Sequence, residues 1–471
     1  MDFAALLLTT FGHEQHLTHN QQPIMNYCDV VSDSRKVTPG ALFVAIPGVN
    51  VNGAQFIRQA REKGAAAVMG ATEDCDIRVA DPRRAYAEAC AEYFGHPSHE
   101  LLLCGITGTN GKTTTTLLLR DMLAQGGLLP GLITTVAIEW PGHSEPAACT
   151  TPDARTLQAT LDTMRKNRCR AAVMEVSSHA IDQKRIAACR YAVLAFTNLT
   201  QDHLDYHGDM ESYYQAKAQL FRDYPDVPAV INVDDPYGKR LFDELSSAGH
   251  TRLFPYSPNA IPASFTAHGT EATFTFGART ITFRTALCGR YNLANLLCAA
   301  TAARALGVTV DAILCAITAA KPQWGRLEAV APGVFVDYAH TDDALANVLS
   351  TLREVTTGKL ICVFGCGGDR DRTKRPRMAA AVERYADLIF VTSDNPRSEE
   401  PEAIIADILP GFTHAQPMTE PDRRKAITVA LRMRSENDVV LIAGKGHEPY
   451  QEIKGIRYPY SDADAVRAFY A

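Results

Sequence analysis

The sequence predicts an α/β protein with three domains, in which parallel sheets are covered by helices. Short apolar runs alternate with helical patterns along most of the chain, which is the rhythm of a parallel sheet with crossover helices. The length of 471 residues corresponds to about three domains at roughly 150 residues each. The hydrophobic fraction of 46% supplies a sizeable core without disulfide or metal staples.

Residues 1–97 are predicted to form a small α/β domain. GALFVAIPG (40–48) has the composition of a strand, and FIRQAREKGAAAVM (56–69) has a helical pattern. The segment YFGHPSHE (93–100) places Gly, Pro and His ahead of an apolar run, so we draw the first boundary there. The opening MDFAALLLTTFGHE has no basic flank and no small-residue cleavage site, and we expect no secretory signal.

Residues 98–324 are predicted to form a central parallel-sheet domain. Its strand candidates are LLLCGIT, AAVMEVSS, YAVLAFTNL and PAVINVDD. TFTFGARTITFRT (273–285) alternates at period two around a Gly-Ala turn, which predicts an attached β-hairpin region. The loop-rich AAKPQWGRLEAVAPG (319–333) marks the second boundary.

Residues 325–471 are predicted to form a third domain with another parallel sheet. Its strand candidates VFVDYAH, KLICVFGCGG, ADLIFVTSDN and DVVLIAGKG each end in polar or Gly-rich turns. Ligands of open parallel sheets gather outside the carboxyl ends of the strands, so each turn is a candidate wall of a site.

Charge and cysteine usage exclude several classes of protein. The net charge of -6 and the lack of a basic stripe argue against a nucleic-acid partner. No apolar stretch approaches the roughly 20 residues of a membrane span, so we expect no membrane insertion. The 12 cysteines form no C-x-x-C pair, which is typical of a reducing compartment. We therefore expect a cytoplasmic protein.

The stretch GITGTNGKTTTT (105–116) follows an apolar strand and opens a helical pattern, which predicts a phosphate-binding loop. A strict Walker A motif needs Gly where this chain has Ile106, but the small residues and the strand-loop-helix context remain. We expect Lys112 to reach the terminal phosphates of ATP and the Thr113 hydroxyl to bind Mg²⁺. The alternative is a Gly/Thr-rich helix cap that binds no nucleotide. The candidate ATP-binding residues of the loop are Gly108, Thr109, Asn110, Gly111, Lys112, Thr113 and Thr114.

Two further residues are candidate Mg²⁺ ligands. Glu175 ends the strand AAVMEV, where nucleotide-hydrolysing sheets commonly present an acid. His203 in NLTQDHLDYHGD is the second, although a loop histidine is more often a polar surface or cap residue.

Eight segments, in order, carry a resemblance to the Mur ligase family, and within it to the UDP-N-acetylmuramoyl-dipeptide ligases. They are TGTNGKTTT, MEVSSHAIDQKR, FTNLTQDHLDYHGDMESYYQAKAQLF, GRYNLANLLCA, DYAHTDDAL, GCGGDRDRTKRPRM, SDNPRSEEP and AGKGHEPYQ. The resemblance implies an N-terminal domain for the UDP group, a central P-loop ATPase and a C-terminal Rossmann-like domain for an incoming amino acid. It also implies ATP-dependent amide formation through an acyl phosphate, which belongs to peptidoglycan precursor synthesis.

The resemblance assigns roles to individual residues. The implied catalytic set is Lys112, Glu175, His203 and Lys217, and the implied metal set is Thr113, Glu175, His203 and Lys217. Lys217 would serve as a carbamylated ligand, whereas its pattern alone predicts an ordinary surface lysine. Further ATP contacts fall on Asn292, Asn295, Arg326, Asp337, Tyr338 and His340. Contacts to the UDP substrate fall on Ser34, Thr150, Thr151, Ser177, Gln183 and Arg185, although Asn52 and Ala54 depart from the usual Asp and His of the nearby loop.

The turn SDNPRSEEP bears on which amino acid is added. In the family, D-N-P-R accompanies meso-diaminopimelate, and Arg397 would hold its distal carboxylate while Glu448 accepts from its distal ammonium. With lysine as substrate, Arg397 would be a buried, unpaired charge, which is costly. The implied diaminopimelate set is Arg370, Asp394, Asn395, Arg397, Gly444 and Glu448. Asp342 replaces the usual Pro in DYAHTDDAL, and we expect only a looser turn.

The expected partners are small molecules: the UDP-N-acetylmuramoyl dipeptide and meso-diaminopimelate, with ATP and Mg²⁺ as cofactors and a monomeric enzyme. One alternative is a related amide ligase that adds L-lysine or serves another pathway, such as folylpolyglutamate synthesis. The other is a P-loop binding module that uses nucleotide only to switch conformation. Dependence of ATP turnover on both substrates separates the three.

Overall fold

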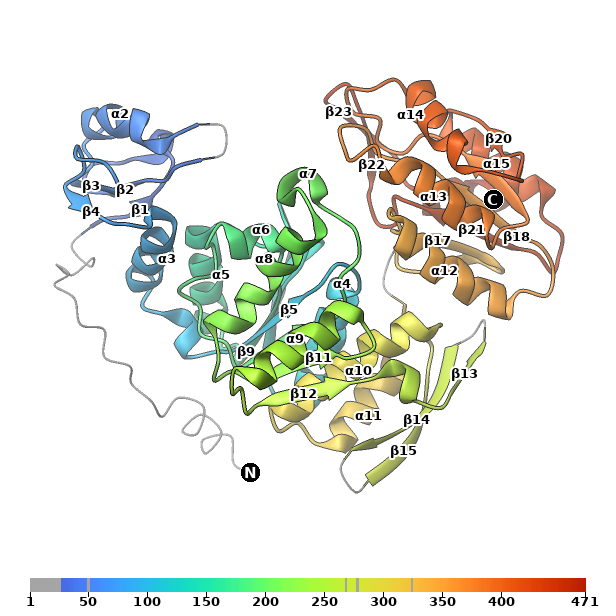
Figure 1. The fold of residues 1–471 in the computed structure, drawn as a ribbon, viewed down its shortest axis with the longest axis horizontal. Helices are drawn as coiled ribbons and strands as arrows, with labels where there is room; N and C mark the ends of the chain where they lie inside the picture. Colours follow the sequence, from blue (N-terminus) through green and yellow to red (C-terminus); the bar gives the residue numbers. More distant parts are fainter. Residues whose placement is uncertain (1–26, 49–50, 267–268, 277–278, 323–324) are drawn as a thin grey trace.

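The computed structural model describes residues 27–48, 51–266, 269–276, 279–322 and 325–471. Three parts follow one another along the chain, coloured blue, cyan to yellow, and orange to red in Figure 1. The predictions about MDFAALLLTTFGHE and the Gly277-Ala278 turn lie outside the described residues. No helix in the ranges given above is both long and apolar enough to cross a bilayer. The division of the chain at residues 97 and 324 stays a prediction.

The N-terminal part contains a small parallel sheet in the order β1-β2-β3-β4. Its strands are β1 (Val30–Val31), β2 (Leu42–Ala45), β3 (Ala67–Gly70) and β4 (Ile77–Arg78), and its helical elements are η2 (Ser34–Lys36), η3 (Gly53–Phe56), α2 (Ile57–Glu62) and α3 (Pro82–Tyr93). The strand predicted in 40–48 is confirmed, but the helical pattern assigned to 56–69 is wrong in its second half. The helix ends at Glu62, Gly64 takes a left-handed turn at φ 85°, and residues 67–70 form the fully buried β3 beside β2. An Ala-rich run therefore becomes a strand because a sheet edge is available to pair with it.

The central part is built on an eight-stranded sheet in the order β12-β11-β10-β5-β9-β6-β7-β8. Its strands are β5 (Leu102–Thr107), β6 (Pro130–Ile133), β7 (Ala137–Trp140), β8 (His143–Pro146), β9 (Ala171–Glu175), β10 (Val193–Phe196), β11 (Ala229–Asn232) and β12 (Leu253–Tyr256). Its helical elements are η4 (Pro97–His99), α4 (Lys112–Gln125), α5 (Ala154–Lys166), α6 (Ser178–Asp182), α7 (Leu204–His207), α8 (Met210–Asp223), α9 (Pro236–Ser247), η5 (Pro258–Ala260), α10 (Arg290–Ala305) and α11 (Val310–Ala319). The four predicted strands are confirmed as β5, β9, β10 and β11, which pair in parallel.

Both faces of the sheet are buried at its central strands, such as β5, β9 and β10. Cys104 and Ile106 of β5 pack with residues of α4 and α10, whereas Leu103 packs on the opposite side with residues of α5 and α8. The predicted hairpin is confirmed as the antiparallel pair β14 (Gly269–Phe276) and β15 (Arg279–Thr285), to which β13 (Ala263–Thr266) adds. Burial on both faces fixes the carboxyl ends of the central strands, where the phosphate loop begins.

The C-terminal part has a six-stranded sheet in the order β16-β17-β21-β18-β19-β20. Its strands are β16 (Glu328–Ala331), β17 (Val334–Asp337), β18 (Leu360–Phe364), β19 (Leu388–Val391), β20 (Met418–Thr419) and β21 (Val439–Ala443), with a separate hairpin of β22 (Tyr450–Ile453) and β23 (Ile456–Pro459). Its helical elements are α12 (Asp342–Val355), α13 (Lys374–Glu383), α14 (Pro401–Ile408), η6 (Leu409–Gly411), α15 (Arg423–Met433) and α16 (Asp462–Tyr470). The four predicted strands are confirmed as β17, β18, β19 and β21. The segment 319–333, predicted to be loop, also contains β16, which pairs antiparallel with β17.

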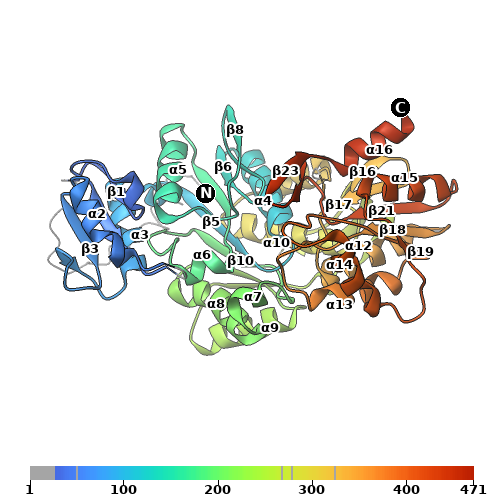
Figure 2. The ribbon, with the colours of Figure 1, turned by 90° about the horizontal axis from the view of Figure 1, so that it is seen from above.

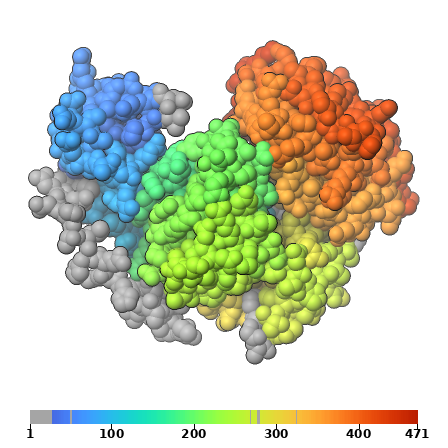
Figure 3. Space-filling model, viewed as in Figure 1, coloured from blue at the N-terminus to red at the C-terminus, as the bar shows by residue number. Residues whose placement is uncertain are grey.

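The three parts are arranged in a row with the central part in the middle (Figure 2). On the face seen in Figure 3, the N-terminal and C-terminal parts are separated by a notch whose floor is the central part. Contacts also cross from the central to the C-terminal part. Asn110 Nδ2 donates to Asp343 Oδ2 at 2.8 Å, and Arg377 bonds both Gln201 and Asp342. The carboxyl ends of β5 and β17 thereby border the same cavity.

Candidate active site

The phosphate loop, residues 108–111, connects β5 to α4, and two of its glycines have no room for a side chain. Gly108 has φ 145°, and a Cβ there would lie 1.9 Å from Thr197 Oγ1. Gly111 has φ 82°, and a Cβ there would lie 2.1 Å from Asn295 Oδ1. Both positions therefore require glycine on conformational and on steric grounds.

The loop is held in place by the end of β10. The backbone N–H of Asn110 donates to Asn198 Oδ1 at 2.9 Å, and that of Thr109 donates to the Asn198 carbonyl at 2.9 Å. Thr197 Oγ1 donates to the carbonyl of Asn110 at 2.7 Å. The loop is thus shaped by bonds to the neighbouring strand, and the helix N-terminus that follows it favours an anion.

Two lysines share one carbonyl of the loop. Lys112 Nζ donates to Gly108 O at 2.9 Å and to Thr109 O at 2.7 Å, and Lys217 Nζ donates to Gly108 O at 2.9 Å. Lys217 is only 1% exposed, so the prediction of an ordinary surface lysine is wrong. Burial, together with the nearby Lys112 charge, sets the pKa of Lys217 well below its usual value, and burial also lowers the pKa of Lys112. The neutral amine, which is the form that reacts with an electrophile, is therefore easier to reach at Lys217 than at an exposed lysine.

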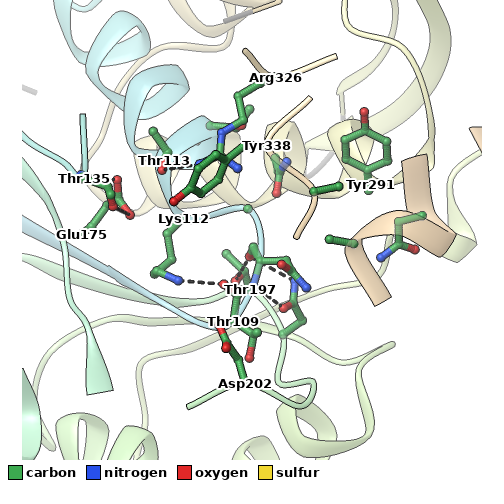
Figure 4. A pocket seen from close by; sticks show the side chains of 18 of the residues that line it. Thr109, Lys112, Thr113, Thr135, Glu175, Thr197, Asp202, Tyr291, Arg326 and Tyr338 are labelled. Atoms are coloured by element: carbon green, nitrogen blue, oxygen red, sulfur yellow. Dashed lines mark hydrogen bonds between the residues drawn. The ribbon is translucent and has the colours of Figure 1, made fainter. Parts of the chain in front are cut away.

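Glu175 lies at the end of β9, as predicted, and is 1% exposed. Its carboxylate accepts from the Thr135 N–H at 3.0 Å and from Thr135 Oγ1 at 3.1 Å (Figure 4). His203 stands at the start of α7, with a half-exposed side chain 3.5 Å from Asp202. Within the described residues, no three His, Cys, Asp and Glu side chains gather as a metal cage. Glu175 and the Thr113 hydroxyl offer oxygen donors of the kind that Mg²⁺ takes together with substrate phosphates.

A cavity of about 270 Å³ opens above the loop and is lined by both the central and the C-terminal parts. Most predicted residues of the loop, the metal set and the ATP set line it: Thr109, Asn110, Gly111, Lys112, Thr113, Thr114, Glu175, His203, Lys217, Asn292, Asn295, Arg326, Asp337, Tyr338 and His340. Gly108 is not among the lining residues. The structure therefore brings these predicted side chains together from both parts of the chain.

The guanidinium group of Arg326 lies in this cavity with one N–H donor that has no hydrogen-bond partner among the described residues. Its Nη2 donates to Thr113 Oγ1 at 3.4 Å, and its guanidinium lies 4.8 Å from the centre of the Tyr338 ring. Its buried Nε has no hydrogen-bond partner among the described residues. An unpaired guanidinium N–H beside a phosphate loop fits an anionic ligand such as ATP.

Asp337 and the two asparagines shape the remaining wall. Asp337 accepts from the N–H groups of Leu327 at 2.6 Å and Ala339 at 2.7 Å, and burial raises its pKa. Asn292 and Asn295 are buried on one face of α10, and Asn295 Nδ2 lies 3.4 Å from Asn292 Oδ1. Asp337 therefore holds the backbone of both flanking segments, and both asparagines line the cavity, with Asn295 beside the loop at Gly111.

The residues predicted for the UDP substrate fall into two groups. Arg185 donates to Gln183 Oε1 at 2.7 Å and to the Thr151 carbonyl at 2.9 Å, while Thr150 and Ser177 line the cavity. Ser34 is instead buried in the N-terminal part, where its hydroxyl donates to Gln59 Oε1 at 2.7 Å. Ser34 does not line the cavity, so the structure gathers five of these six residues on the central part.

The predicted diaminopimelate residues lie outside the cavity, on three turns that follow β18, β19 and β21. Asn395 Nδ2 donates to Glu448 Oε2 at 2.8 Å, and a Cβ on Gly444 would lie 2.4 Å from Asp394 Oδ2. A Cβ on Gly367 would lie 2.9 Å from Arg397 Nη1 and 3.8 Å from Arg370 Cγ, which places both arginines beside Gly367. The structure therefore brings the predicted diaminopimelate residues close to one another.

Arg397 has partners of its own even without a distal carboxylate, so the prediction that it would then be an unpaired charge is wrong. Arg397 Nε lies 3.8 Å from Glu452 Oε2, and its Nη1 donates to the Gly368 carbonyl at 2.6 Å. Its backbone has φ 52°, a left-handed conformation fixed by bonds between its N–H and Glu452 O and between Lys454 N–H and its carbonyl. The β22–β23 hairpin thus supplies a partner that the DNPR pattern does not reveal.

Several residues that shape these sites were missed. Asp202, Asn198 and Thr135 line the cavity, and Lys445 lies between Asn395 and Glu448. Asp342, expected only to loosen a turn, begins α12 and pairs with Arg377 at 2.6 Å. Asp202 stood next to a predicted residue, whereas Lys445 carried no sequence signal beyond the glycines on either side of it.

Comparison with protein families shows three matches in succession. Residues 29–92 match the Mur ligase family catalytic domain, residues 106–303 the Mur ligase middle domain, and residues 325–446 the Mur ligase glutamate ligase domain. Together they cover most of the chain.

Curated relatives are similar over almost the whole length. The UDP-N-acetylmuramoyl-L-alanyl-D-glutamate–2,6-diaminopimelate ligase of Gloeobacter violaceus is 44% identical, covering 94% of each chain. The ligase of the same name from Aquifex aeolicus is 43% identical, covering 93% of this chain and 92% of that one. A solved structure of a ligase with this name is 32% identical, with a TM-score of 0.70 and 98% of each chain covered.

More distant structures share the fold. MurF ligase from Thermotoga maritima, in complex with ADP, is 18% identical with a TM-score of 0.63, covering 96% of this chain and 98% of that one. A folylpolyglutamate synthase of Mycobacterium tuberculosis is 19% identical with a TM-score of 0.63, covering 82% of this chain and 94% of that one. These two likenesses concern the architecture alone.

Proposed function

Since the chain belongs to the Mur ligase family, we propose that it is an ATP-dependent ligase that adds meso-2,6-diaminopimelate to UDP-N-acetylmuramoyl-L-Ala-D-Glu. The new amide joins the amino acid to the γ-carboxyl group of D-glutamate, as a step of peptidoglycan precursor synthesis. The observation that carries this conclusion is 44% identity, over 94% of the chain, to a ligase named for these substrates.

We assign ATP to the cavity between the central and C-terminal parts. Three features support this: the two glycines without room for side chains, the helix N-terminus at Lys112, and the unpaired Nε of Arg326. Asn292, Asn295, Asp337, Tyr338 and His340 complete the lining, as proposed from the sequence. Because the lining comes from both parts, closing them together would exclude water from an acyl phosphate.

We assign Mg²⁺ to the side of the cavity that holds Thr113, Glu175, His203 and Lys217. When bound there, Mg²⁺ supplies charge neutralisation for phosphoryl transfer. Lys217 can bind Mg²⁺ only if its side chain is converted to an anion. We therefore propose that its neutral amine adds CO₂ and releases a proton to give a carbamate. The low pKa of Lys217 and its burial support this modification.

We place the acyl donor along Thr150, Thr151, Ser177, Gln183 and Arg185, with its UDP end toward Ser34. Arg185 lies between Gln183 and the Thr151 carbonyl, and its planar fork suits a carboxylate or pyrophosphate. The D-glutamate carboxylate attacks the terminal phosphorus of ATP and releases ADP. The diaminopimelate amine then displaces phosphate from the acyl group to form the amide.

We place the distal end of diaminopimelate between the turns of residues 394–397 and 444–448. Arg397 and Arg370 supply positive charge for the distal carboxylate, and Asp394 and Glu448 supply negative charge for the distal ammonium. Asn395 joins the two turns through Glu448.

The test is the release of ADP and phosphate by the purified protein. We expect turnover that depends on both UDP-N-acetylmuramoyl-L-Ala-D-Glu and meso-diaminopimelate. Comparable turnover with L-lysine would support the lysine-adding alternative, and turnover without either substrate would support the nucleotide switch. We further propose a monomeric, cytoplasmic enzyme, with domain boundaries near residues 97 and 324. Sedimentation of the purified protein at assay concentration checks the monomer.

A further inference from the structure

A buried lysine lies at the centre of the two turns that carry the amino-acid residues. Lys445 is 0% exposed, and its Nζ donates to Asn395 Oδ1 at 2.9 Å and to Glu448 Oε2 at 3.1 Å. The ammonium also lies 5.7 Å from the centre of the Tyr450 ring. Lys445 belongs to the turn of residues 444–448, where it bonds Glu448, and it connects that turn to the other one through Asn395. It does not line the cavity.

These bonds fix the orientation of the Asn395 amide. Asn395 Oδ1 accepts from Lys445 Nζ and from the Glu452 N–H at 2.9 Å, so both of its neighbours on that side are donors. Its Nδ2 then donates to Glu448 Oε2 at 2.8 Å. A flipped amide would set donors against donors, so Lys445 and the Glu452 N–H together set which way the Asn395 amide faces.

Lys445 also compensates the charge of Glu448. The Glu448 side chain is 17% exposed, and burying a carboxylate is costly unless an opposite charge or hydrogen bonds compensate it. Nearby, Arg397 is already opposed by Glu452 at 3.8 Å. Because Glu448 is paired with Lys445 and Glu452 with Arg397, the site presents a nearly balanced set of charges to the distal end of the substrate.

We propose that Lys445 is a positioning residue that sets the choice of amino acid. By holding Asn395 and compensating Glu448, it favours a distal group that carries both an ammonium and a carboxylate over one that carries an ammonium alone. Without Lys445, Glu448 would face the site uncompensated and attract a lone cation. This inference rests on the proposed function and concerns the same site.

The test compares steady-state kinetics of Lys445→Met and Lys445→Gln with those of the unmodified protein, varying meso-diaminopimelate and L-lysine in turn. We expect KM for meso-diaminopimelate to rise at least tenfold, with KM for ATP within twofold. We also expect the ratio of kcat/KM for meso-diaminopimelate over L-lysine to fall at least tenfold. Arg457→Met is the matched control, because its guanidinium lies 4.4 Å from the same Tyr450 ring but has an exposed side chain. We expect no change in the ratio for this variant.

A double variant, Lys445→Met with Glu448→Gln, removes both charges, and the gain toward L-lysine should vanish. An unchanged ratio in both neutral Lys445 variants would overturn the inference, as would equal losses with the two amino acids. Failure of both variants to fold would assign Lys445 to stability alone and also overturn it. If the unmodified protein does not turn over meso-diaminopimelate, the proposed function fails instead, and the two failures are thereby distinguished.

Discussion

Replacing Asp462 by Asn should loosen the sheet that carries the amino-acid turns, because it leaves a guanidinium buried without its counter-charge. The side chains of Arg423 and Asp462 are both 0% exposed, and Arg423 binds the carboxylate through Nε at 2.8 Å and Nη2 at 2.7 Å. Burial alone would lower the pKa of Arg423, but Asp462 raises it. Arg423 also donates to the carbonyls of Ser393 at 3.3 Å and Ala443 at 2.9 Å, so it fastens the ends of β19 and β21.

The magnitude follows from these contacts. Removing one partner of a buried ion pair costs about 3–5 kcal/mol, which is the expected effect of Asp462→Asn. The double variant Arg423→Met with Asp462→Leu leaves no buried charge. It removes the hydrogen bonds that Arg423 donates to two carbonyls, and each lost bond lowers the free energy of unfolding by about 1 kcal/mol, or roughly 2 kcal/mol in total. The single substitution should therefore be more harmful than the double one.

Amide hydrogen exchange resolved to peptides of β19 and β21 is the assay, because it reports local opening within a chain of several domains. Since each 1.4 kcal/mol is about a factor of ten, Asp462→Asn should speed exchange there by roughly a hundredfold to a few thousandfold, and the double variant by about thirtyfold. Asp464→Asn is the control on the same helix, because its pair with Arg467 is exposed. Less than a tenfold effect of Asp462→Asn, or a double variant worse than the single one, would refute the reasoning.

Three further predictions concern the phosphate loop, the amino-acid turn and acid stability. Gly111→Ala should lower ATP turnover at least a hundredfold. Gly127→Ala is the control, because it has a similar φ of 83° but no atom within 4 Å of the added Cβ, and it should change turnover less than threefold. Similar losses in both variants would leave only backbone strain as the cause. Arg397→Lys should keep the fold and raise KM for meso-diaminopimelate several-fold in steady-state assays, because a planar fork is replaced by a point charge; an unchanged KM would count against the assigned role. The N–H groups of Ala415, His414 and Thr413 lower the pKa of Glu383 to about 2. The stabilisation from Glu383 is therefore present above about pH 4.5 and lost as the pH falls toward 2. The difference in Tm between the unmodified protein and Glu383→Gln should shrink as the pH falls over that range. A difference in Tm that stays constant would contradict this role of Glu383.

The strands that the sequence predicted correctly are those with an apolar run bounded by polar or glycine-rich turns, such as β5 and β21. The segment 67–70 was misread because Ala has a high helix propensity, and pairing with β2 overrides that propensity. The half-exposed β16 carries no such run, so it was expected to be loop.

The candidate site was predictable where the chemistry lies in contiguous motifs, and less so where it depends on tertiary contacts. The phosphate loop and its glycines followed from local spacing, and the resemblance placed Asn292 and Asp337 beside it. The partner of Arg397 comes from a hairpin more than fifty positions further along the chain, which spacing cannot reveal. Lys217 looked like a surface residue because its helix is amphipathic, and only its contact with Gly108 shows the burial.

The contact between Asn110 and Asp343 gives inhibitor chemistry a target at the edge of the nucleotide cavity, where the central and C-terminal parts meet. One side chain belongs to the phosphate loop and the other to α12, so a compound that wedges between them would hold the two parts of the chain apart. Such a compound need not carry phosphates or resemble adenine. Resistance to it would arise through substitutions at this seam rather than in the loop glycines.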